Sequence, residues 1–101
     1  MEEQAVTLDE PGGQVACRFH ARDVHLVMGP AAPGSSVRFH VRIDGQPPRA
    51  AHGADVDDEG NGTAAGQRLH QLIRQPGPVT DRTFEITFLD PGAQVHAFTF
   101  G

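Results

Sequence analysis

The side chains best suited to chemistry lie in the acidic stretch from Asp55 to Gly62, which reads DVDDEGNG. Oxygen-bearing side chains at alternate positions, followed by glycine, match the start of a calcium-binding loop. The twelfth position of such a loop needs a bidentate glutamate, and here it is Gly66, so the pattern is incomplete. The alternative is a solvated hairpin loop in which Asp, Asn and Gly form turns. The calcium hypothesis predicts the ligands Asp55, Asp57, Glu59 and Asn61.

Nucleophiles and softer metal ligands are sparse. The six histidines are His20, His25, His40, His52, His70 and His96, and none follows an H-x-H or H-E-x-x-H spacing. Cys17 is the only cysteine, which excludes an intrachain disulfide, and its alternation with Val15 and Phe19 predicts a place in the core. The chain has no G-x-S-x-G motif and no glycine-rich phosphate loop. We therefore expect no catalytic activity and no cofactor beyond the calcium ion considered above.

Arginine and histidine alternate at the outward positions of two predicted strands, 15–21 and 37–43. If these two strands pair in one sheet, the side chains form a cationic patch that could dock an acidic protein surface or an anionic sugar. The alternative is an ordinary exposed polar face. With one histidine added from the polar loop 52–63, the candidate binding residues are Arg18, His20, Arg38, His40, Arg42 and His52.

Composition narrows the classes of partner. The chain has 101 residues, one domain's length, and a formal net charge of −5, and all eight basic residues are arginine. An acidic chain without a basic run is expected to bind nucleic acids and anionic membranes poorly. No run approaches the ~20 apolar residues of a membrane span, so no membrane insertion is expected. The acidic first ten residues also lack the apolar segment of a signal peptide.

Alternating hydrophobicity predicts an all-β protein, an antiparallel jelly-roll-type β-sandwich of about seven to eight strands. The expected strands cover residues 5–8, 15–21, 23–28, 37–43, 83–89 and 95–100. The strand at 23–28 is apolar at both parities and is expected to be buried on both sides. Turns or loops are expected at 10–13, 29–36, 44–45 and 52–63. Residues 68–75 fit either one helical turn or a strand, and the Pro-Gly-Pro that follows makes a helix short.

The predicted core consists of inward-facing side chains from these strands. They are Val15, Cys17, Phe19, Leu26, Val37, Phe39, Val41, Ile43, Phe84, Ile86, Phe88, Phe98 and Phe100. Five of the six phenylalanines fall at positions where alternation alone predicts burial, and the chain contains no Trp and no Tyr.

Three segments, FHARDVHLVMGP, RLHQLIRQPGPVTDRTFEITFLDPG and AFTFG, resemble the C-terminal module of DipZ-type thioredoxin-like proteins. The resemblance covers about Ala5 to Gly101 and implies a carbohydrate-binding-module-like β-sandwich that follows a thioredoxin-like redox domain. It also implies a strand for 68–75, and an extracytoplasmic location if the parent protein is DipZ-like. The family usually has Tyr at His70 and His96, and a strand-forming segment upstream of residue 1. Without that segment an edge could be open, which would favour an edge-strand dimer.

The resemblance implies a function in binding rather than catalysis, because the family's redox cysteines lie in the preceding domain. We expect an accessory module that docks or orients that thioredoxin-like domain, or a partner protein. The alternative is a carbohydrate- or glycan-binding module, as the fold suggests. A sugar ring commonly stacks on an exposed Trp or Tyr, and this chain has neither.

Overall fold

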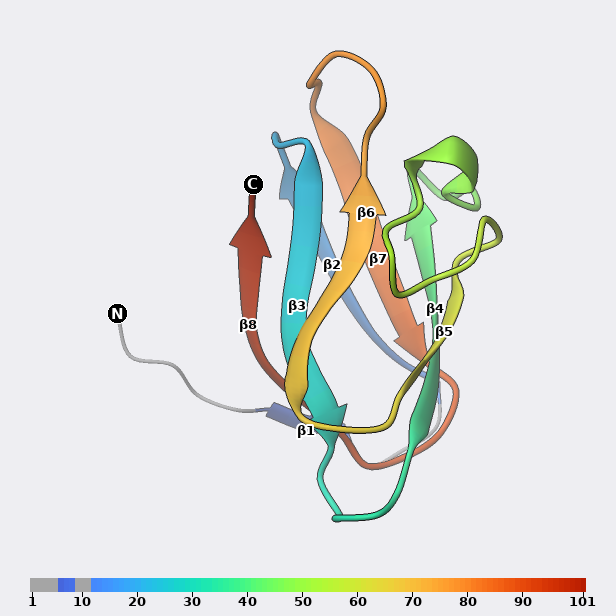
Figure 1. Cartoon of the computed structure of the whole chain (residues 1–101), viewed down its shortest axis with the longest axis vertical. Helices are drawn as coiled ribbons and strands as arrows, with labels where there is room; N and C mark the ends of the chain where they lie inside the picture. The colour runs from blue at the N-terminus through green and yellow to red at the C-terminus, as the bar shows by residue number, and fades with distance from the viewer. Residues whose placement is uncertain (1–5, 9–11) are drawn as a thin grey trace.

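The computed structural model of the chain describes residues 6–8 and 12–101, which form two four-stranded antiparallel sheets packed face to face (Figure 1). Sheet A has the strand order β1-β8-β3-β6, and sheet B has the order β2-β7-β4-β5. The strands are β1 (Val6–Leu8), β2 (Gly13–Phe19), β3 (Asp23–Pro30), β4 (Val37–Ile43), β5 (Asn61–Ala64), β6 (Arg68–Arg74), β7 (Arg82–Phe88) and β8 (Ala93–Phe100). The predicted antiparallel β-sandwich is confirmed, and residues 68–74 form a strand. Ala5, Glu10 and Pro11, which the predictions included, lie outside the described residues.

Alternation of apolar and polar residues explains the two layers. In β4 the side chains of Phe39 and Val41 are buried, whereas Arg38 and Arg42 are exposed. Because successive side chains of a strand point to opposite faces, each strand supplies one face to the core and one to the surface. The buried apolar core consists of Phe19, Val24, Leu26, Met28, Val37, Phe39, Val41, Ile43, Val56, Ala64, Leu72, Ile73, Phe84, Ile86, Phe88, Ala93 and Val95.

The edge strand β5 requires a glycine at the position that pairs with Phe39 of β4. Gly62 pairs with Phe39, and a Cβ atom on Gly62 would lie 2.5 Å from Cζ of the Phe39 ring. The ring therefore occupies the space that a side chain at position 62 would need. This strand falls in a region predicted to be loop, because four residues with a central glycine give no hydrophobic alternation.

Two other predictions are corrected in β3. The strand lies between β8 and β6, yet it is not buried on both sides, because His25 and Val27 on its outer face are only half-buried. A two-layer sandwich leaves the outer face of each sheet to solvent. The strand also continues through Pro30, so the loop predicted from residue 29 begins at residue 31.

Two β-bulges change which side chains face the core. One lies between Val24 and His25, opposite β6, and brings both Leu72 and Ile73 into the core. The other lies between Val27 and Met28, opposite β8. A bulge inserts one extra residue into a strand, so side-chain parity is reset beyond it. Alternation alone would place His96 on the same face as Phe98. Because of the second bulge the two residues do not share a face, and Nε2 of His96 lies 2.9 Å from Oε1 of Gln67.

At one side of the sandwich, several side chains that were predicted to lie in the core are not fully buried. Val15 and Cys17 on β2 and Phe98 on β8 are only half-buried, and Phe100 is 47% exposed. We call these four residues the β2–β8 seam. Stacked rings run along it, with centroid separations of 6.1 Å from Phe19 to Phe100 and from Phe100 to Phe98. Because Phe100 is exposed, the prediction that it belongs to the core is wrong. Burial raises the pKa of the Cys17 thiol, which makes it a weaker nucleophile.

The described residues contain no helix of sufficient length and hydrophobicity to cross a membrane.

A histidine occupies an inward-facing position of β6, an edge strand of sheet A. His70 is fully buried, its ring meets Phe39 edge to face, and its Nδ1 lies 3.0 Å from the carbonyl oxygen of Arg68. Its Nε2 atom has no hydrogen-bond partner among the described residues. Burial, and next the charge of Arg68, lower the pKa of His70, although Asp55 partly opposes this change. The neutral ring, donating from Nδ1 to the Arg68 carbonyl, fits this environment best.

We predict that His70 makes stability depend on pH. Because its pKa is lower in the folded state, the unfolded chain binds a proton first, and stability falls as pH decreases below about 6.5. The loss should approach about 1.4 kcal/mol per pH unit over this range. Urea denaturation of His70→Phe should show a smaller pH dependence than the wild type, with His52→Gln as the control at an exposed histidine. Equal pH slopes for His70→Phe and wild type would contradict this prediction.

Candidate binding face on sheet B

The outward side chains of sheet B form a continuous polar surface, which we call the sheet B face. Strand register places these side chains in rows that cross the sheet. One row contains Arg18 and Thr83, the next Ala16, Glu85 and Arg42, and the next Gln14, Thr87, His40 and Asn61. The last row contains Arg38 and Thr63, with Leu89 just beyond the end of β7.

In the row that crosses all four strands, two hydrogen bonds each join a pair of neighbouring side chains. The Gln14 amide nitrogen donates to Oγ1 of Thr87 at 3.0 Å, and His40 Nδ1 lies 2.9 Å from Oδ1 of Asn61. Side chains held by their neighbours lose less conformational freedom when a ligand binds. The row is therefore a preorganised set of polar hydrogen-bonding side chains.

An arginine–carboxylate pair fixes the end of the face. Arg38 donates from Nε and Nη2 to the two carboxylate oxygens of Asp90, at 3.0 and 2.8 Å, and its backbone N–H donates at 2.9 Å. These contacts, with the guanidinium first, lower the pKa of Asp90 to about 2. Leu89 N–H also donates to the Arg38 carbonyl at 2.8 Å. The bidentate geometry neutralises Arg38 and holds the β7–β8 turn against β4.

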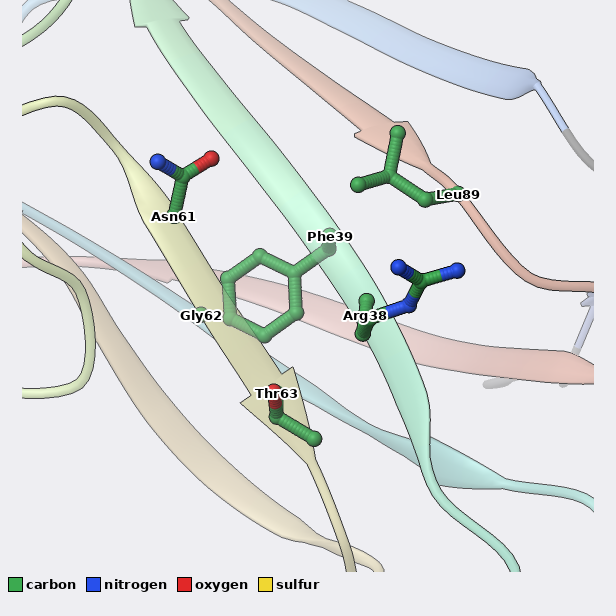
Figure 2. Close-up of a pocket in the computed structure, with 6 residues that line it drawn as sticks. All are labelled: Arg38, Phe39, Asn61, Gly62, Thr63 and Leu89. Carbon is green, nitrogen blue, oxygen red and sulfur yellow. The ribbon is translucent and has the colours of Figure 1, made fainter.

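Two adjoining hollows of about 350 and 370 Å³ lie on this face and share Asn61 and Leu89. Leu89 is 43% exposed and is the large apolar side chain that the face presents to solvent. Figure 2 shows the first hollow, with the Phe39 ring beside Gly62 and with Arg38 and Leu89 on its other side. The remaining lining residues of the two hollows are Thr63, Gln14, His40, Arg42 and Thr87.

The sequence-predicted binding residues reach this face only in part. Arg18, Arg38, His40 and Arg42 all point outward from sheet B, but β2 and β4 do not pair, because β7 lies between them. Glu85 of β7 lies opposite Arg42, so opposite charges are interspersed. His20 lies beyond the end of β2, with Nδ1 2.6 Å from Oδ1 of Asp81. His52 pairs with Ile73 of sheet A. The result is a charge-balanced polar face rather than a cationic patch.

Two carboxylates of the acidic loop, those of Asp55 and Asp57, accept hydrogen bonds from other residues of the fold. Asp55 accepts hydrogen bonds from Arg68 at 2.8 Å and from the backbone of Gln71 at 2.6 Å, and Arg68 is the main cause of its lowered pKa. Asp57 accepts from the backbone N–H groups of Glu59 and Asn61, at 3.0 and 2.9 Å. Among the described residues, no three acidic, histidine or cysteine side chains gather as metal ligands would. The calcium ligands therefore remain a prediction. The Asp57 contacts are those of a turn former, whereas the Asp55 contacts attach the loop to β6.

We predict that Asp55→Ala destabilises the fold by about 1–3 kcal/mol, because the Arg68 guanidinium and the Gln71 N–H lose a partly buried acceptor. Denaturation of the wild type and the variant with calcium, and again with EGTA, measures the effect. If the carboxylate acts only within the fold, the difference is the same in both conditions. A wild-type stability that rises with calcium and is lost in Asp55→Ala would instead establish a metal site.

Sequence reasoning missed Gln14, Thr87 and Leu89, which line the hollows. It named Asn61 individually as a metal ligand, and otherwise only as part of the polar loop 52–62, a candidate docking surface. The sequence carries only a weak signal that could have identified these residues. Each lies at an outward position of a strand or turn, where alternation predicts exposure but cannot say which strands are neighbours. Only the strand order of sheet B brings β2, β7, β4 and β5 together.

Comparisons with known proteins agree with this architecture. Among solved structures, the chain is similar to family two carbohydrate esterases from Cellvibrio japonicus and from Clostridium thermocellum, the latter in complex with cellohexaose. The TM-scores are 0.68 and 0.69 at 14% and 13% identity, covering 95% and 94% of this chain but 26% of each esterase chain. It is also similar to the CBM36-1 domain of a multidomain xylanase from the hindgut metagenome of Trinervitermes trinervoides, with TM-score 0.55, 13% identity and coverage of 99% and 97%.

These similarities concern the fold. The chain spans about a quarter of the length of the two esterases, so it corresponds in size to one part of them. A search of curated protein sequences found no match. A family described as "Thioredoxin like C-terminal domain" matches residues 1–101, the whole chain. The chain therefore belongs to the thioredoxin-like C-terminal domain family.

Proposed function

We propose that this chain is a non-catalytic accessory module that follows a thioredoxin-like domain and docks or orients that domain or its protein partner. Membership of a family of C-terminal domains supports the position in the chain. The arrangement around Leu89 supports the docking role and carries the proposal. An exposed leucine lies between two hollows and is surrounded by polar side chains whose positions are fixed by hydrogen bonds.

This arrangement matches the anatomy of a small protein interface. Apolar anchors that carry binding energy are typically surrounded by polar side chains that exclude water. Arg38 and Arg42 flank the leucine, and arginine is enriched in such interfaces. Interspersed charges, as at Glu85 and Arg42, favour a partner of mixed charge over a uniformly acidic one.

We predict that Leu89→Ser weakens docking at least about tenfold, because it removes the apolar anchor. The measurement is a ¹⁵N-HSQC titration of this chain with the thioredoxin-like domain that precedes it in its parent protein. Amide shifts are expected at His40, Asn61 and Leu89. Leu69→Ser is a matched control, since Leu69 is 40% exposed but lies on sheet A. A silent spectrum at near-millimolar partner, or loss of binding in Leu69→Ser alone, would contradict the role of the sheet B face.

Glycan binding is a second candidate, favoured by the hydrogen-bonded row of Gln14, Thr87, His40 and Asn61. Polar donors and acceptors that line a hollow suit sugar hydroxyl groups. Against this role, the described residues expose no aromatic ring on the sheet B face, because Phe39 is fully buried and Phe100 lies in the β2–β8 seam. Stacking on such a ring is a common part of sugar recognition.

The glycan role predicts amide shifts at His40 and Asn61 on adding millimolar cellohexaose or a xylo-oligosaccharide. These sugars are chosen because the structurally similar proteins are an esterase solved with cellohexaose and a xylanase module. Asn61→Ala should abolish these shifts by removing both the Asn61 amide and the group that positions His40. Leu89→Ser should leave them largely unchanged, which separates this role from protein docking. Spectra unchanged by both sugars would remove the support for this candidate.

A further inference from the structure

The four edge strands of the sandwich differ in how they are protected. An unprotected edge offers unpaired N–H and C=O groups to another chain, and natural sheets shorten or cover their edges. Strand β1 has three residues and β5 has four. The β6 edge is covered by the loop before β5, where Gly53 and Asp55 donate backbone bonds to Leu72 and Gln71 at 2.9 and 3.0 Å. Three of the four edges therefore carry a recognised form of protection.

Within residues 6–8 and 12–101, neither of these devices protects the fourth edge, β2. It has seven residues, and among the described parts of the chain it pairs only with β7. Its register with β7 runs from Gly13 to Phe19 without a bulge, unlike both pairings of β3. The strand contains no proline and no lysine, and Arg18 is its one charged residue. A regular strand of this length is well suited to accept a further strand.

Apolar surface lies directly beside this edge. On the inner side, the β2–β8 seam leaves Val15 and Cys17 of β2 and Phe98 of β8 half-buried, and Phe100 of β8 exposed. A strand added to β2 would extend sheet B past this seam and cover part of it. Backbone hydrogen bonding and apolar burial therefore favour the same addition.

The β2 sequence is complementary to itself. Antiparallel pairing of two copies centred on Ala16 places Gln14 opposite Arg18 of the second copy on the outer side. On the inner side it places Val15 opposite Cys17, so small apolar side chains meet. No like charges are opposed, as stable cross-strand pairs require. A two-fold axis at Ala16 also closes the assembly at two copies.

We propose that β2 pairs with β2 of a second copy, so that the two B sheets become one continuous sheet in a symmetric dimer. The dimer interface shares Gln14 with the second hollow of the sheet B face, but it does not depend on the docking role proposed for Leu89. Since one strand pair and part of a seam form a small interface, below about 1,200 Å², the dimer should be weak, with a dissociation constant in the micromolar range.

Sedimentation velocity tests the dimer across concentration. The wild-type mass should rise from that of the 10.8 kDa chain toward twice that value between about 10 µM and about 1 mM. Ala16→Lys should raise the dissociation constant at least about tenfold, because two lysines would meet at the two-fold axis. Within one copy the new lysine would lie opposite Glu85, so the fold should tolerate it. Gln71→Lys adds the same charge to the covered edge strand β6 and should dimerise like the wild type.

Hydrogen exchange gives a second readout that needs no variant. Amides of β2 that point away from β7 should become protected at high concentration, whereas amides of β5 should not change. A wild type that stays monomeric at about 1 mM overturns the proposal, as does a dimer that persists unchanged in Ala16→Lys or that protects another strand. The outcome is separable from the Leu89 titration, because the dimer is measured on this chain alone, without the thioredoxin-like domain.

Discussion

The packing of Phe39, Phe84 and Phe88 between the two sheets is the constraint on which the other features depend. All three rings are fully buried, and all three belong to neighbouring strands of sheet B. Since side chains alternate, burying these positions forces Arg38, His40, Glu85 and Thr87 to the outer face. The Phe39 ring also requires glycine at position 62, in the strand whose register places Asn61 beside His40. The core thus determines which side chains form the sheet B face.

Charge pairing explains why this face is ordered yet carries little net charge. Asp90 neutralises Arg38, and the Asp44 carboxylate accepts from the backbone of Thr83 and from Arg82, which lower its pKa in that order. Exposed pairs of this kind add little stability, and their main effect here is to fix positions at strand ends. A face built in this way recognises shape and hydrogen-bonding pattern more than overall charge.

The sequence predicted the structure correctly wherever alternation within a single strand determines which side chains are buried. Strand Val37–Ile43 was predicted with its bounds and its buried face, because no bulge or glycine interrupts it. The sequence alone did not predict burial where pairing with a neighbouring strand determines which way a side chain points. The bulges opposite β6 and β8 reset parity near His70 and His96, and β5 is too short to show alternation. The binding face was predicted only as an Arg/His set, because β7 between β2 and β4 is a property of topology rather than of local pattern.

The two proposed surfaces have a consequence when taken together. Pairing through β2 would place the outer faces of both B sheets on the same side of one continuous sheet, so two Leu89 anchors would face the same direction. A weak contact gains from such duplication, because binding at the first site raises the effective concentration at the second. An interface of only two hollows and one leucine would suit a tethered domain, for which covalent linkage already supplies high effective concentration. Weak contacts therefore fit an accessory module that must hold its partner without locking it.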